Sequence, residues 1–157
     1  MAADTYTVER STTIAAPAER VYDQIADFHK WTSWSPWEDL DPALRRKYSG
    51  AELGAGAVYA WSGNRKAGEG RMEIVRAVDA ERVDIDLQFV KPFKSRSDTS
   101  FVLTPEGDDS TRVLWTMSGT KTFMTKVMGV FSSMDKMIGP DFEKGLDRLR
   151  KVSEGRS

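Results

Sequence analysis

Cysteine is absent from the sequence, and histidine occurs only once, as His29. Without cysteine the chain can form no disulfide bond, no thiolate nucleophile and no cysteine-based zinc site, and its redox compartment is left open. A Ser/His/Asp triad would need His29 as its base. This residue lies at the end of a predicted helix, where a cationic side chain suits the helix dipole. We therefore predict no metal site and no cofactor.

A charge excess of either sign is also missing. The 23 Lys and Arg residues nearly balance the 24 Asp and Glu residues, and the net charge is −1. Nucleic-acid-binding proteins usually carry a basic excess, so we expect no nucleic-acid partner. The basic run Arg45-Arg46-Lys47 has two interpretations, a solvated strand or loop end and a phosphate-binding patch. The acidic groups at 38–41 and 106–109 do not match a calcium-binding loop, and we predict solvated loops there.

Long apolar runs are lacking as well. No segment reaches the roughly 20 apolar residues that cross a bilayer, and the opening "MAADTYTVERSTTI" has no apolar run of signal-peptide length. We therefore expect a cytoplasmic protein without integral membrane contact. A chain of 157 residues can bury a sizeable core. We predict a single domain over residues 1–157, with an ordered core at about 5–153, and leave the oligomeric state open.

Hydrophobic periodicity predicts a strand, two helices, several strands and a long helix, in that order. Residues 5–14 alternate and are rich in β-branched side chains, as in a strand. Pro17 suits a first helical turn, which begins a helix of about three turns. Residues 29–34 add a short second helix. The strands predicted after it are Ala57–Gly63, Gly70–Val78, Arg82–Val90 and the hairpin Ser97–Gly119.

The chain ends in a predicted amphipathic helix from Met134 to Val152. Its apolar residues recur at spacings of three and four, and Gly139-Pro140 predicts a kink or a break. The clean alternation of the strands indicates an antiparallel sheet with one solvated face. The apolar face of the sheet and the apolar stripe of the helix must bury each other. We therefore predict an α+β fold in which a curved antiparallel sheet wraps around the long helix.

Two clusters of large apolar residues point to a binding function. Trp31, Trp34 and Trp37 lie three residues apart. They fit a plug that closes one end of the core, a cavity wall or a surface for a partner, and a plug at a cavity mouth would combine the first two. The segment from Met124 to Met137 holds four of the seven methionines. Methionine-rich surfaces adapt to varied apolar ligands, although ordinary core packing explains the segment equally well.

Several segments resemble the START-like superfamily, also called SRPBCC. "TTIAAPAERVYDQIADFHKWTSWSPW" is similar to its opening, and "GAVYAWSGN" and "GEGRMEI" resemble middle strands of its bacterial polyketide cyclase/dehydrase and lipid-transport branch. "MDKMIGPDFEKGLDRLRKV" resembles the C-terminal helix of that branch. The resemblance covers about residues 5–153. It implies a helix-grip fold with about seven strands around the C-terminal helix, two short helices after the first strand, and a cavity for hydrophobic molecules. It brings no shared catalytic motif, so no catalytic residue is assigned.

We predict that the protein binds or carries a hydrophobic small molecule, such as a lipid or polyketide, between the sheet and the C-terminal helix. Entry is expected near the Met124–Met137 segment and the turn at Lys91–Ser95. One alternative is a cyclase or aromatase, with its acid or base among Tyr59, Arg71, Glu73 and Asp98. Another is a protein-interaction module that uses the same groove. Ligand cavities are mostly apolar and aromatic, and the predicted lining comprises Tyr59, Trp61, Leu87, Phe89, Phe101, Trp115, Met117, Met128, Phe131, Ile138 and Phe142.

Overall fold

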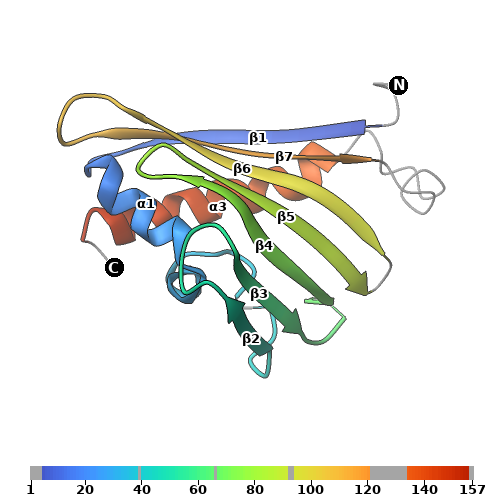
Figure 1. The fold of residues 1–157 in the computed structure, drawn as a ribbon. Helices are drawn as coiled ribbons and strands as arrows, with labels where there is room; N and C mark the ends of the chain where they lie inside the picture. Colours follow the sequence, from blue (N-terminus) through green and yellow to red (C-terminus); the bar gives the residue numbers. More distant parts are fainter. Residues whose placement is uncertain (1–4, 39, 66, 92–93, 121–133, 156–157) are drawn as a thin grey trace.

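The computed structural model describes residues 5–38, 40–65, 67–91, 94–120 and 134–155. Its strands form a seven-stranded antiparallel sheet in the order β1-β7-β6-β5-β4-β3-β2 (Figure 1). The strands are β1 (Thr5–Ile14), β2 (Arg45–Gly50), β3 (Ala57–Ser62), β4 (Glu69–Val78), β5 (Arg82–Lys91), β6 (Ser95–Pro105) and β7 (Thr111–Thr120). The helices are α1 (Ala18–Ala26), the 3-10 helix η2 (Phe28–Ser33) and α3 (Met134–Ser153).

The sheet carries its core on the face that α1 and α3 cover (Figure 1). Val21 and Ile25 of α1 and Phe142 of α3 are fully buried, together with sheet residues such as Ile74 and Ile85. Because the first strand pairs with the last one, β1 and β2 are left as the two edges of the sheet. This arrangement confirms the predicted α+β helix-grip fold, with short helices after the first strand.

A kink or a break was predicted at Gly139-Pro140, and the break does not occur, because helix α3 continues through Pro140. A proline disfavours helical backbone in the residue before it partly through a clash with that residue's Cβ. Gly139 has no Cβ, which removes this part of the conflict. Beyond the proline, Phe142, Leu146 and Leu149 are buried at spacings of three and four and hold the helix against the sheet.

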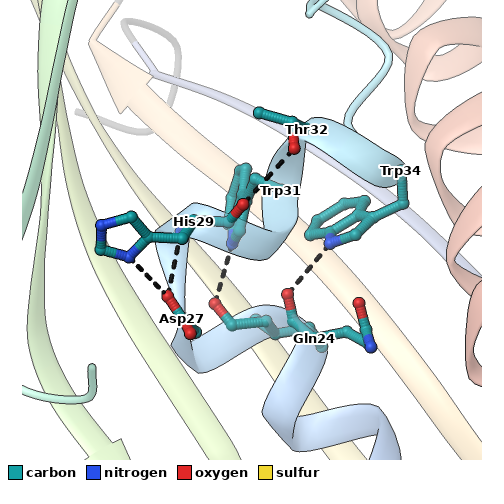
Figure 2. A network of polar contacts seen from close by, with 7 residues as sticks. Gln24, Asp27, His29, Trp31, Thr32 and Trp34 are labelled. Atoms are coloured by element: carbon teal, nitrogen blue, oxygen red, sulfur yellow. Dashed lines mark hydrogen bonds and ion pairs between the residues drawn. The ribbon is translucent and has the colours of Figure 1, made fainter. Parts of the chain in front are cut away.

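The predicted second short helix is the 3-10 helix η2, and two tryptophans tie it to α1 (Figure 2). The Trp31 indole N–H donates to the Ile25 carbonyl at 2.8 Å, and the Trp34 indole N–H donates to the Gln24 carbonyl at 3.0 Å. These carbonyls belong to the last turn of α1, where backbone acceptors lack helical partners. The tryptophans therefore close the end of α1 while they fill the core.

Strand β2 contains the basic run Arg45-Arg46-Lys47, which the sequence left between two interpretations. It forms an edge strand paired with β3, in which Arg45, Arg46 and Lys47 are all exposed. Arg46 also donates a hydrogen bond to Glu38. A solvated strand therefore describes this run, and Arg46 has an added role as the partner of Glu38.

Candidate functional site

A cavity of about 230 Å³ lies between the inner face of the sheet, the segment 35–44 and the N-terminal half of α3. Its walls are largely apolar. Ligand sites in proteins are concave, mostly apolar and supplied with a few placed polar groups. The residues that line it are Ser35, Trp37, Glu38, Leu40, Leu44, Tyr59, Trp61, Ala67, Met72, Leu87, Phe89, Met117 and Ile138.

Cross-strand register sets the sheet wall of the cavity. Tyr59 of β3 lies opposite Met72 of β4, which in turn lies opposite Leu87 of β5, so the three side chains form one row on the inner face. In the next row, Gly70 separates Trp61 from Phe89.

The missing side chain at Gly70 lets the Trp61 ring lie across β4. A Cβ atom at this glycine would meet the indole ring at 2.8 Å. The Trp61 ring therefore reaches Phe89, with the two ring centroids 5.4 Å apart in an edge-to-face arrangement. Its indole N–H donates to the Ala67 carbonyl at 2.9 Å, which fixes the ring in place.

Glu38 places a carboxylate in this apolar wall. Its side chain is only 8% exposed. One oxygen, Oε1, accepts a hydrogen bond from Arg46 Nε at 2.7 Å, and Oε2 accepts the hydroxyl proton of Tyr59 at 2.7 Å. Nearly buried carboxylates need such partners, since burial without them is costly. The cavity thus contains one charge-compensated acceptor group.

The surroundings of Tyr59 hold its phenol in the protonated form. Burial raises the pKa of Tyr59, and the hydrogen bond and negative charge of Glu38 raise it further. The hydrogen bond to Glu38 likewise raises the pKa of Arg46. At neutral pH the phenol therefore donates to the carboxylate while the guanidinium balances its charge.

The structure divides the predicted lining residues between this cavity and a packed aromatic core. Tyr59, Trp61, Leu87, Phe89, Met117 and Ile138 line the cavity. The side chains of Phe101, Trp115 and Phe142 are instead buried in the core, where the Trp115 ring stacks on Phe142 at 4.0 Å and on Phe101 at 4.7 Å. Met128 and Phe131 lie outside the described residues, as does the part of the Met124–Met137 segment before residue 134.

The structure places the three tryptophans in two different surroundings. Trp31 and Trp34 are buried in the core, with ring centroids 4.6 Å apart. Trp37 is half-buried, lines the cavity and packs edge-to-face on Trp115 at 5.7 Å. The cluster thus runs from the core to the cavity wall.

Of the four residues considered as acid or base, Tyr59 alone lines the cavity among the described residues. Arg71 and Glu73 lie half-exposed on the opposite face of β4, where they form an ion pair at 3.2 Å, and Asp98 is exposed. The single histidine lies in η2 beside Asp27, with Nδ1 at 2.9 Å from Oδ1 of that residue (Figure 2). Its ring stacks on Tyr48. Within the described ranges, no three His, Asp or Glu side chains gather as a metal site would require.

Glu38 is a correction to the sequence analysis, which placed its acidic group in a solvated loop. Tertiary structure overrides the local composition here, because Arg46 and Tyr59 come from β2 and β3 and reach the loop only after folding. The alternation of the 45–50 segment indicated only which of its own side chains face inward. As an edge strand in register with β3, it turns Arg46 and Tyr48 inward, opposite Trp61 and Tyr59.

The fold is that of a helix-grip protein with an apolar cavity, and the sequence comparison agrees with this fold. Residues 5–154 match the family described as polyketide cyclase / dehydrase and lipid transport. The chain therefore belongs to this family, which confirms the resemblance to the START-like superfamily. Comparison with curated proteins gives no match.

Solved structures from several bacteria share the fold. A protein from Thermobifida fusca is 21% identical, with a TM-score of 0.68 over 94% of this chain and 92% of that one. TTHA0849 from Thermus thermophilus is also 21% identical, with a TM-score of 0.66 over 96% and 98%. CV1439 from Chromobacterium violaceum is 15% identical, with a TM-score of 0.66 over 94% and 97%. At these identities the likeness concerns the fold alone. In the part of this chain that the structure describes, no helix is long and apolar enough to span a membrane.

Proposed function

We propose that this protein binds or carries a hydrophobic small molecule, of a lipid or polyketide-like class, in the cavity beside Trp37, Trp61 and Leu87. The observation that carries the proposal is the apolar cavity itself, which is lined by four aromatic residues and several aliphatic side chains. Burial contributes about 25 cal/mol per Å² of apolar surface. A ligand that buries about 250 Å² would gain roughly 6 kcal/mol before entropic costs, enough for moderate affinity.

The volume of the cavity limits the part of a ligand that it can enclose. An engineered cavity of about 150 Å³ holds one benzene molecule. By proportion, 230 Å³ fits a bicyclic group of about ten heavy atoms. We therefore expect a bicyclic molecule, or the bicyclic end of a longer one.

Native mass spectrometry of the purified protein, followed by calorimetric titration with naphthalene, tests the binding function. We expect naphthalene to bind the natural protein and to bind the Leu87→Trp variant at least tenfold more weakly, since the larger ring fills the cavity. Val90→Trp is the matched control, because Val90 lies exposed on the same strand. Equal binding by all three proteins would place the naphthalene site elsewhere, and a failure of all three to bind would contradict the proposal.

A second candidate function is acid–base catalysis on a polyketide-like substrate, and Glu38 is the observation that favours it. A buried carboxylate hydrogen-bonded to a protonated phenol supplies a general acid and a general base in one cavity. If the protein is a cyclase, aromatic product should form from a linear poly-β-ketone thioester above the uncatalysed rate. Positioned proton transfer contributes about 10²–10⁴-fold, so Glu38→Gln and Tyr59→Phe should each lose at least tenfold.

The interaction-module alternative has less support in the structure. The large exposed apolar side chains among the described residues are Leu53, Val75 and Val90. They lie on the β2–β3 connection, β4 and β5, and do not line the cavity. Protein-docking sites usually expose contiguous apolar patches, so we retain the small-molecule proposal.

A further inference from the structure

We infer that the cavity selects ligands that carry a neutral hydrogen-bond donor, an alcohol or a phenol, and that Glu38 accepts this hydrogen bond. The inference rests on the proposed binding function and adds the chemical class of the ligand. Glu38 is the only charged side chain that the described residues contribute to the cavity wall. The hydrogen bonding of Glu38 therefore decides which polar group a ligand in this otherwise apolar cavity can carry.

The first argument is the unused acceptor capacity of the carboxylate. An ionised carboxylate has about four acceptor positions and no donor. Arg46 and Tyr59 occupy one position on each oxygen. The Tyr59 hydroxyl donates its only proton to Glu38, and its oxygen also interacts with the Arg46 guanidinium, so Tyr59 has no proton left for a ligand. The open acceptor positions of Glu38 therefore favour a hydrogen-bond donor on the ligand.

The second argument is the charge balance. Arg46 already compensates Glu38, with its Nε 2.7 Å from the carboxylate. An ammonium ligand would bring an uncompensated positive charge into an apolar cavity. A carboxylate ligand would bring an uncompensated negative charge, and it has no proton to donate to Glu38. Burial of an unpaired charge is far more costly than burial of a neutral group that forms its hydrogen bond. A neutral hydroxyl supplies the proton without either penalty.

The other polar side chain on the wall agrees with this assignment. Ser35 is 2% exposed, and its Oγ accepts the Trp37 backbone N–H at 3.4 Å. A hydroxyl both donates and accepts, so the proton of Ser35 stays available for the oxygen of the ligand. A ligand hydroxyl can donate to Glu38 and accept from Ser35. An alcohol or phenol therefore fits these two side chains better than an ammonium group, which can only donate.

Four probes on one scaffold test the inference by calorimetric titration at pH 7: 2-naphthol, naphthalene, 2-naphthoate and the 2-naphthylmethylammonium ion. We expect 2-naphthol to bind about tenfold more tightly than naphthalene, as a hydrogen bond to a charged acceptor provides. The two ions should bind more weakly than naphthalene.

Two substitutions should have different effects on the naphthol-to-naphthalene preference. In Glu38→Gln the acceptor loses its charge, and the preference should fall to about threefold or less. In Tyr59→Phe a competing donor disappears while Glu38 remains, so the preference should stay or rise. If Glu38→Gln fails to fold, the Tyr59→Phe variant still tests the inference, since a lower preference for 2-naphthol in that variant would overturn it.

The outcomes separate the inference from the binding proposal. If no probe binds, the proposed function fails, and the inference fails with it. If naphthalene and 2-naphthol bind equally well, the cavity binds ligands but Glu38 does not select a donor, and only the inference is overturned. Tightest binding of the naphthoate or of the ammonium ion would also overturn the inference alone.

Discussion

Trp31, Trp34 and Trp37 have the same spacing in the sequence but different surroundings in the structure. The first two donate their indole protons to carbonyls at the end of α1, and the third lines the cavity. At the scale of single residues, the polar atom of each side chain decides its role. A buried indole N–H needs an acceptor, and the last turn of α1 offers two.

Thr99 is a residue whose polar atom has no such partner. Its hydroxyl is buried on the inner face of β6 without a hydrogen bond. An unpaired buried polar group costs about 1–3 kcal/mol, and valine has nearly the same shape. We therefore predict that Thr99→Val raises the free energy of unfolding by about 1 kcal/mol, measured by urea denaturation.

The matched control for this substitution is Thr111→Val. The Thr111 hydroxyl is equally buried but donates to the Ala16 carbonyl at 2.8 Å. Its loss leaves that acceptor unpaired and should lower the free energy of unfolding by about 1–2 kcal/mol. A comparable loss in Thr99→Val would show that the Thr99 hydroxyl has a bonding partner in solution, such as a water molecule or a ligand.

Single residues also mark the limit of what the sequence could predict about the site. Tyr59, Trp61, Leu87 and Phe89 could be assigned to the inner face from strand alternation alone. Glu38 could not, because its burial depends on partners from β2 and β3. The aromatic residues Phe101, Trp115 and Phe142 follow the same alternation as the cavity residues, and only their stacking places them in the core.

At the scale of elements, β3, β4 and β5 form the cavity wall through their register. The sequence predicted these strands to within one or two residues, because their alternation is regular and their ends carry turn residues. Strand β2 was less evident, since its alternation combines Arg46 and Tyr48 with three other polar residues. Periodicity finds strands with one apolar face and misses an edge strand whose inward residues are charged or amphipathic.

Gly70 tests the importance of this register for the cavity. An added Cβ would collide with the Trp61 ring at 2.8 Å and with the backbone of β5. Overpacking of this kind costs about 1–3 kcal/mol. We predict that Gly70→Ala lowers the free energy of unfolding by this amount and weakens 2-naphthol binding at least tenfold, because Trp61 is displaced. Urea denaturation and calorimetry measure the two effects.

Gly107→Ala separates a change in the cavity from a general loss of stability. Gly107 lies in the turn between β6 and β7, with a φ of +88° and open space around it. Alanine there strains the backbone and should reduce stability, but affinity for 2-naphthol should stay unchanged. An equal loss of affinity in both variants would mean that Trp61 does not form the binding surface.

At the scale of the whole molecule, the helices and the cavity share one face of the sheet, and the other face carries charged side chains. Asp86 belongs to that outer face. Burial raises the pKa of Asp86, but hydrogen bonds from Gln88 and Arg96 outweigh burial, and the pKa lies below its usual value. Acid stability of the fold should therefore depend on this residue.

The sign of the pH dependence follows from the lowered pKa. A carboxyl group whose pKa is lower in the folded state stabilises the protein above its unfolded pKa and loses this contribution as the pH falls. Between pH 7 and pH 3, the free energy of unfolding should fall further in the natural protein than in Asp86→Asn, measured with urea at both pH values. Equal falls would show that the Asp86 carboxylate contributes no pH-dependent stability.

The central claim is that a small hydrophobic molecule binds beside Trp37 and Trp61, and the five tryptophans provide the most direct test. We would label tryptophan with ¹⁵N, assign the five indole N–H signals with Trp→Phe variants, and titrate the protein with 2-naphthol. The account predicts saturable shifts of the Trp37 and Trp61 signals. The Trp31 and Trp34 signals, held on α1 by their hydrogen bonds, should stay nearly fixed. Unchanged Trp37 and Trp61 signals, or larger shifts at Trp31 and Trp34, would contradict it.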